Sequence, residues 1–205
     1  MYPRSDKIIK LSNHIIKKWH KKEQRISSLD DALKLIRNNK LNDVLYHVEL
    51  LSLLNTVLWH EEDKARDKFA SDSDIAGVKR RIDKLNAMRV NKTEEIDSIL
   101  LETNKINSNA PLNTETAGSV IDRLTILVLK KYHMEVEANR KDSSKELKEK
   151  CAENLKMINI QMDNLVSAYN YLINEIESGE RRYTLYRQFK MYNDPDLNPV
   201  LYSKK

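Results

Sequence analysis

The chain has 205 residues, of which 33% are charged, and it contains 3 Gly, 4 Pro and 1 Cys with a net charge of +5. This length suits one domain with its own core, and so few helix-breaking residues favour an all-α fold. The single cysteine, Cys151, excludes an internal disulfide and a zinc site built from several cysteines.

Positive charge is concentrated at the two ends of the chain. Residues 1–25 contain eight Lys or Arg and two acids, and residues 180–205 contain six and three. No nucleic-acid motif or row of stacking aromatics accompanies these ends, so we expect solvated helix faces and no nucleic-acid partner. The N-terminus lacks the apolar run of a signal peptide and no segment has the length of a transmembrane helix, which predicts a cytoplasmic protein.

The first 40 residues predict two helices. Residues 6–22 form an amphipathic helix, and His14 and His20 are expected at its surface. Its apolar stripe consists of Ile8, Leu11, Ile15 and Trp19. After a serine-containing break, which can supply an N-cap, a short helix is predicted over residues 29–37, and residues 38–40 are typical of a turn.

Residues 41–69 contain no Gly or Pro and predict one long helix. Its core-facing stripe consists of Leu41, Val44, Val48, Leu51, Leu58 and Trp59, and residues 50–59 are apolar nearly all round. The same stripe continues through Asn55, Glu62, Asp63 and Arg66. Buried charges must be paired, so these residues indicate a site unless the helix end emerges into water there.

A second helix with a polar line on its apolar face is predicted over residues 75–103, after a capping loop at 71–74. Ile75, Ile82 and Leu100 share its stripe. The polar residues on that stripe are Lys79, Asn86, Arg89 and Thr93. Because two such helices can satisfy each other's polar groups, we predict a polar site between them.

Residues 104–116 predict a loop that leads into a helix over residues 120–140. Thr114, Thr116 or Ser119 can cap this helix, and Gly118 permits close approach of its backbone to a neighbour or ligand. A helix N-terminus preceded by hydroxyl groups can bind an anion, although an ordinary capped helix fits equally well.

The interior of this helix is apolar in every direction over residues 124–129, which predicts the central helix of a bundle. Its polar residues gather near the start, at Asp122 and Arg123, and two to three turns later, at Lys130 and His133. His133 can act as a base or a ligand, although a single histidine on a helix is more often structural.

A heptad seam follows a turn at residues 141–144 and ends at Gly179. Its members are Leu147, Cys151, Leu155, Ile158, Met162, Leu165, Tyr169, Leu172 and Ile176. The seam packs either along the chain's own helices or against a second copy in a homodimer. Residues 180–190 can begin as a helix anchored by Tyr183, Tyr186 and Phe189, and we expect the tail to pack across the bundle.

Two classes of helical metal site have sequence motifs that can be compared with this chain. A ferritin-like di-iron site needs Glu-x-x-His pairs, which are absent, so we expect no dedicated transition-metal site. Helical nucleotide pyrophosphohydrolases hold magnesium with paired acidic motifs, and Glu94-x-x-Asp97 matches one half, while the cluster at residues 61–63 lacks the second spacing. Magnesium therefore stays open as a cofactor, and nothing indicates zinc, an iron–sulfur cluster or haem.

Four segments together resemble a bacterial domain-of-unknown-function family, number 4254. They are Asn55-x-x-Leu-Trp-His-x-Glu-Asp-x-Ala-Arg66, Lys79-Arg-x-Ile-Asp83-x-x-Asn86-x-x-Arg89, Asn113-Thr-Glu-Thr-x-Gly-Ser-x-Ile-Asp-Arg-Leu124 with its continuation to His133, and Tyr186-x-Gln-Phe-Lys-Met-Tyr-Asn-Asp-Pro-x-Leu-Asn-Pro199. The chain departs from the family at Asn91-Lys92, where members often continue Arg-Asn-Asp, and at Ala117, where many carry Pro.

The resemblance implies a set of signature residues and a genomic association. The signature residues are Asn55, His60, Glu62, Asp63, Arg66, Asn86, Arg89, Glu115, Ser119, Asp122 and Arg123. They coincide with the polar residues that helical periodicity places inward or at a helix start, which favours a functional pocket over a structural ion-pair network. Family members are often encoded beside glycosyltransferases and other cell-envelope polysaccharide genes, which implies a role near lipopolysaccharide or capsule assembly.

We therefore predict an all-α bundle of five to six long, mostly antiparallel helices, with an extended C-terminal tail packed over it. We expect one helical domain over residues 1–205, with N-terminal helices in 1–40, the core bundle in 41–178 and the tail in 179–205.

The expected function is binding of an anionic ligand, a sugar nucleotide or a phosphorylated glycan precursor, in an interhelical pocket. Its negative charge would be held by Arg66, Arg89, Arg123 and Lys130. The candidates for acid–base chemistry are His60, Glu62 and Asp63. The alternative is a non-catalytic accessory or scaffold protein for a glycosyltransferase, and a magnesium-dependent pyrophosphohydrolase is more remote.

Overall fold

The computed structural model describes residues 2–26, 28–36, 40–41, 43–189 and 196–202, with side chains up to residue 200. The helices are α1 (Ser5–Lys22), α2 (Leu29–Leu33), α3 (Val44–Lys64), α4 (Asp72–Thr103), α5 (Ala117–Ala138), α6 (Lys145–Ser178) and α7 (Pro199–Tyr202), and a 3-10 turn, η1, covers Glu23–Arg25. No strand forms within the described ranges, which confirms the all-α prediction. No helix among them is both long and apolar enough to cross a membrane.

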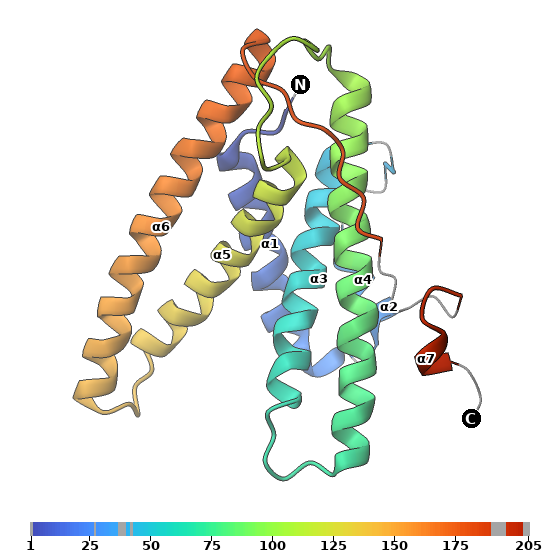
Figure 1. The fold of residues 1–205 in the computed structure, drawn as a ribbon. Helices are drawn as coiled ribbons and strands as arrows, with labels where there is room; N and C mark the ends of the chain where they lie inside the picture. Colours follow the sequence, from blue (N-terminus) through green and yellow to red (C-terminus); the bar gives the residue numbers. More distant parts are fainter. Residues whose placement is uncertain (1, 27, 37–39, 42, 190–195, 203–205) are drawn as a thin grey trace.

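The helices form two hairpins with α1 between them (Figure 1). One hairpin consists of α3 and α4 and the other of α5 and α6, and the two diverge toward the ends that carry their connecting turns. Helix α1 packs against α3 and α5 between the hairpins, and α5 also contacts α3, α4 and α6. Helix α3 likewise contacts α1, α2, α4 and α5, so α5 shares with α3 the central position that was predicted for it alone.

Local capping groups decide where the helices begin. Asp43 accepts the backbone N–H of Leu45, so α3 starts after residue 43, and Leu41 is 66% exposed, outside the helix that was predicted to contain it. Ser71 and Asp74 form a reciprocal capping box, which starts α4 three residues earlier than predicted. Thr116 caps α5, as one of the three candidates.

Two helices end earlier than predicted. Helix α2 stops at Leu33 rather than near residue 37, and α3 stops at Lys64 rather than near Phe69, which is 98% exposed. The end of α3 lies beyond its last buried residue, Glu61, where no packing extends the helix into solvent. After α2 the chain leaves the helix although Leu35 is still buried. By contrast, α6 ends as predicted at Gly179, whose φ of 78° only glycine adopts readily.

The heptad seam of α6 packs on the chain's own helix α5, which is the first of the two alternatives. Its buried members are Cys151, Ile158, Met162, Tyr169 and Ile176. Tyr169 donates its hydroxyl to the Pro3 carbonyl at 2.8 Å and so ties the start of the chain to the end of α6. Cys151 is a buried free thiol, as expected for a small core residue.

The prediction of a helix over residues 180–190 is wrong. Residues 181–189 are extended and run along α4 (Figure 1), because their backbone finds partners outside a helix. The Arg182 N–H donates to the Pro111 carbonyl at 3.0 Å, and the Gln188 N–H donates to Glu94 at 2.8 Å. Only Tyr183 is a buried anchor, while Tyr186 and Phe189 are exposed. The parts of the predicted tail at residues 190–195 and 203–205 lie outside the described residues.

Candidate functional site

A polar pocket of about 390 Å³ lies where α3, α4 and α5 meet. It is lined by Asn55, Leu58, Trp59, Glu62, Asp63, Arg66, Asn86, Arg89, Ile126 and Leu129. Six of these residues were nominated from the polar lines on the two predicted helices, and the fold brings them to one place. Leu58 and Trp59 of α3 and Ile126 and Leu129 of α5 supply its apolar surface, so the pocket combines apolar side chains with a few convergent polar groups.

A hydrogen-bonded network closes the inner end of this pocket. The Asn55 amide is 4% exposed and donates to Asp122 Oδ1 and to Thr125 Oγ1, both at 2.8 Å. Arg89 Nε lies 3.8 Å from Asp122 Oδ2. Burial raises the pKa of the Asp122 carboxyl, and the Asn55 hydrogen bond and the Arg89 charge oppose that shift. Asp122 thus holds Asn55 and attracts Arg89 only loosely, which leaves the guanidinium able to engage a ligand.

The outer end of the pocket is open to water. Arg66 is exposed and bonds back to its own helix, with Nη1 at 2.5 Å from the Glu62 carbonyl and Nη2 at 3.1 Å from Glu62 Oε2. Asp63 is also exposed. Arg66 and Asp63 therefore lie on the core-facing stripe only in the sequence, because the end of α3 emerges into solvent there.

A second, shallower depression of about 590 Å³ adjoins the pocket through Ile126, which lines both. It carries Arg123 and Lys130 of α5 opposite Gln161 and Asn164 of α6. Arg123 is held by both oxygens of Glu115 at 2.8 Å, whereas Lys130 is exposed and has no ion-pair partner among the described residues. Lys130 is therefore the cation most available to a ligand in this depression.

The predicted anion site at the start of α5 is occupied by a carboxylate of the chain itself. The Gly118 N–H donates to Asp97 Oδ1 at 2.7 Å, and the Ser119 N–H donates to the Thr116 hydroxyl at 3.1 Å. The expectation that Glu115 and Ser119 bind a ligand is thus not supported by their position, since neither lines the polar pocket. The carboxylate of Asp97, on the neighbouring helix α4, takes the place at the α5 N-terminus where an anion would interact with the helix dipole.

Asp97 makes the stability of the protein depend on pH. Burial raises the pKa of its carboxyl to about 6, and hydrogen bonds from Thr116 and the Gly118 N–H only partly offset this effect. The folded-state pKa lies above the usual 3.8. The contribution of the Asp97 carboxyl to the free energy of unfolding is therefore complete below about pH 4, and it is lost as the pH rises to about 6.

We expect Asp97→Asn, which cannot ionise and keeps an acceptor for Gly118, to be more stable than the wild type above pH 6 by up to about 3 kcal/mol. The two proteins should converge near pH 4. Urea unfolding at pH 4, 5, 6 and 7 measures both profiles. A difference that is constant across this range would show that Asp97 does not titrate there.

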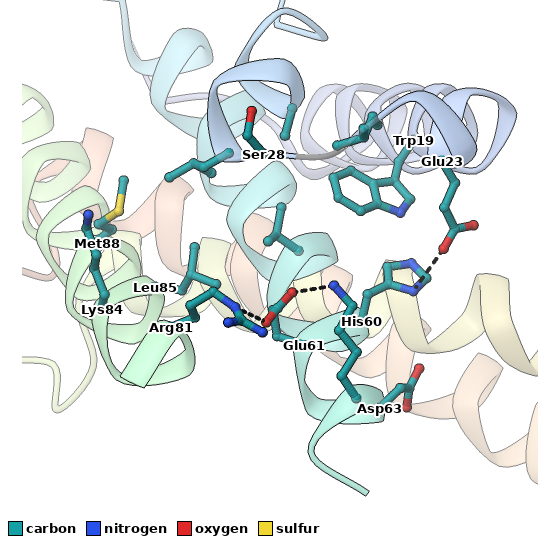
Figure 2. A pocket seen from close by; sticks show the side chains of 15 residues that line it. Trp19, Glu23, Ser28, His60, Glu61, Asp63, Arg81, Lys84, Leu85 and Met88 are labelled. Atoms are coloured by element: carbon teal, nitrogen blue, oxygen red, sulfur yellow. Dashed lines mark hydrogen bonds and ion pairs between the residues drawn. The ribbon is translucent and has the colours of Figure 1, made fainter. Parts of the chain in front are cut away.

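His60 does not share the polar pocket with Glu62, although the sequence grouped them. It lines a larger cavity of about 780 Å³ between the end of α1, α2, α3 and α4. Figure 2 shows its ring turned toward Glu23, with Trp19 beside it. In the same cavity, burial alone would raise the pKa of the Glu61 carboxyl, but hydrogen bonds from Lys64 at 2.6 Å and Arg81 at 2.7 Å lower it.

His60 also belongs to a cluster of three histidines from three helices. One ring nitrogen each of His20, His60 and His133 lies within 4.8 Å of the others. The prediction that His14 and His20 are surface residues is wrong, because both rings are half-buried and their Nε2 atoms are fully covered. Burial lowers the pKa of His133 to about 4, with smaller effects of His20 and His60, so the ring is neutral at pH 7.

No spacing in the sequence indicates this cluster, because its members are far apart in the chain and belong to α1, α3 and α5. The only available signal was the number of histidines near the carboxyl ends of amphipathic helices.

The acidic motif of the pyrophosphohydrolase alternative is already engaged. Glu94 accepts the Gln188 N–H at 2.8 Å and lies 3.2 Å from Arg187, and Asp97 accepts the Gly118 N–H. These two carboxylates therefore serve as anchors for the tail and for α5, and their arrangement does not favour a shared magnesium ion.

Comparison with known proteins identifies the family of this chain. A family model described as a protein of unknown function, DUF4254, matches residues 45–185. No curated protein and no solved structure matches the chain. The matched range includes every residue that lines the polar pocket.

Proposed function

For this chain, which belongs to the DUF4254 family of unknown function, we propose that the polar pocket binds a phosphorylated sugar. A sugar nucleotide or a glycan precursor in cell-envelope polysaccharide synthesis is the expected ligand. The observation that supports this proposal is that six polar residues predicted for the site, from α3, the turn after it and α4, line one pocket of about 390 Å³.

The mixture of charges in the pocket fits such a ligand better than it fits a simple anion. Arg89 supplies a planar fork for a phosphate, while Glu62 and the Asn86 amide suit sugar hydroxyl groups. Trp59 offers an apolar surface for the ring. A pocket of this volume accommodates one sugar phosphate, and a longer sugar nucleotide would continue past Ile126 toward Lys130.

A thermal-shift screen with sugar phosphates and sugar nucleotides, with and without magnesium, tests the proposal. A ligand at a hundred times its dissociation constant adds about 2.7 kcal/mol, which is a shift of roughly 5–11 °C for a chain of this size. We expect Arg89→Ala to weaken binding by roughly 10- to 100-fold, because a charge-assisted hydrogen bond is lost.

Arg80→Ala is the matched control, since Arg80 is an exposed arginine of the same helix and lines neither depression. It should keep the response of the wild type. A response that is equally strong in Arg89→Ala would place the ligand elsewhere, and silence across the panel with an intact melting transition would count against the pocket as a binding site.

Exposed apolar side chains on α6 favour an alternative, an accessory protein for a glycosyltransferase. Met157, Ile160 and Tyr171 are 54%, 53% and 65% exposed and lie within one face of the helix. A homodimer belongs to the same alternative and would use this outward face. Co-purification of a partner without any small-molecule response would favour it.

A further inference from the structure

We propose that His20, His60 and His133 form a binding site for one divalent transition-metal ion, with Zn²⁺ the expected occupant. The three rings come from the end of α1, from α3 and from the second half of α5, and one nitrogen of each lies within 4.8 Å of the others. The site is separate from the polar pocket, and the inference does not rest on the proposed function.

The hydrogen bonds of two rings identify the nitrogens that face the site. His20 Nδ1 lies 2.8 Å from the Ile16 carbonyl oxygen, and His60 Nδ1 lies 3.3 Å from Glu23 Oε1. A carbonyl and a carboxylate can only accept, so each Nδ1 carries the hydrogen, and in a neutral ring each Nε2 then carries a lone pair.

The Nε2 atoms of all three rings are buried and have no hydrogen-bond partner among the described residues. Buried ring nitrogens are normally satisfied, so three in one cluster call for a shared partner. Neighbouring lone pairs repel one another unless a cation or a donor lies between them. A metal ion satisfies all three at once, and imidazole is a preferred ligand of zinc, copper, iron and nickel.

The surroundings match those of known histidine–metal sites. A metal-bound histidine almost always donates its second nitrogen to a carboxylate or a backbone carbonyl, as His60 and His20 do here. Ring stacking fixes the orientation of the other faces, since Trp59 stacks on His133 at 4.5 Å and Trp19 on His60 at 5.4 Å between ring centroids. These contacts orient the rings toward one another before a metal arrives, and binding requires only a small further closure.

The spacing requires a small closure of the rings. Zinc–nitrogen bonds of about 2.1 Å in tetrahedral geometry place ligand nitrogens about 3.4 Å apart, so no pair of ring nitrogens needs to approach by more than roughly 1.4 Å. Small changes in χ1, which swing each imidazole as a whole, supply this movement when they are shared among the three rings. Three protein ligands leave a fourth position for water or a substrate, as in catalytic zinc sites. His60, whose side chain is 17% exposed, gives an ion access from the 780 Å³ cavity.

Tryptophan fluorescence reports directly on this site, because both tryptophans of the chain stack on histidines of the cluster. We expect Co²⁺, added to the full chain after treatment with a chelator, to quench this fluorescence with saturation at one ion per chain. Zn²⁺ should displace it without quenching. Equilibrium dialysis with metal analysis gives the stoichiometry independently.

Single substitutions to glutamine assign the ligands. His20→Gln, His60→Gln and His133→Gln should each weaken Co²⁺ binding by more than about 100-fold, and Glu23→Gln by about 10-fold or more. His47→Gln is the matched control, since His47 is a buried histidine bonded to Glu95 and the Leu41 carbonyl, outside the cluster. It should bind the ion as the wild type does.

Nitrogen chemical shifts of the unaltered protein give a second test that does not depend on the folding of variants. On addition of Zn²⁺, the Nε2 resonances of three histidines should shift while those of His14 and His47 stay. Absence of stoichiometric binding, or binding that survives all three cluster substitutions, would overturn the proposal and leave the cluster as aromatic packing around water.

Discussion

Gly118→Ala should destabilise the protein by about 3 kcal/mol, because α5 begins in direct contact with the backbone of α4. A Cβ atom at Gly118 would lie 2.5 Å from the Thr93 carbonyl oxygen and 2.8 Å from Asp97 Oδ2. Neither contact is compatible with the present packing. Moving α5 away would also lengthen the 2.7 Å hydrogen bond from the Gly118 N–H to Asp97, which is 2% exposed.

Gly77→Ala is the internal control for this experiment. Its Cβ would meet only Arg81 Nη1, at 3.7 Å, in the interior of α4. Alanine is the better helix former there, so we expect a gain of about 0.5–1 kcal/mol. Urea unfolding of both variants at one pH measures the difference. Equal stability of Gly118→Ala and the wild type would contradict the close approach of the two helices.

Asn55→Asp should lower the free energy of unfolding by about 3–5 kcal/mol at pH 8, because it replaces a buried amide donor with a carboxylate beside the buried carboxylate of Asp122. The Asn55 amide nitrogen lies 2.8 Å from Asp122 Oδ1, so the new oxygen would face an oxygen of like charge. The Asp122 pKa is already raised by burial. One carboxyl of the variant therefore has a raised folded-state pKa, and the loss of stability should shrink as the pH falls through that value.

Unfolding of Asn55→Asp at pH 8 and at pH 5 tests this expectation. Asn174→Asp is the matched control, since Asn174 is exposed and accepts a hydrogen bond from Arg4 at 2.7 Å. A carboxylate there keeps the acceptor, so its effect should stay within about 0.5 kcal/mol. A loss for Asn55→Asp that does not depend on pH would show that the new carboxyl escapes to solvent.

The two polar lines show how far periodicity alone can predict a site. A wheel places Asn55, Glu62, Asn86 and Arg89 on the core-facing sides of two helices, and the fold does bring them to one pocket. Helical periodicity does not show whether a polar residue on the core-facing stripe is buried or lies where the helix emerges into water. Arg66 lies on this stripe in the sequence but is exposed in the structure. That distinction depends on how far the neighbouring helix extends.

The same limit explains the residues at the start of α5. The sequence around Thr116 and Gly118 correctly indicated a cap and a close approach. It could not indicate that Asp97 of α4 would occupy the helix N-terminus, because the relative placement of two helices follows from side-chain packing along their whole length.

The all-α class, the capping residues and the end of α6 at Gly179 were determined by the sequence itself, because they depend on groups a few residues apart. Tertiary structure alone decided the extended path of residues 181–189 and the meeting of His20, His60 and His133. The path is set by backbone partners on distant segments, and the histidines are brought together by three helices that local propensity does not orient.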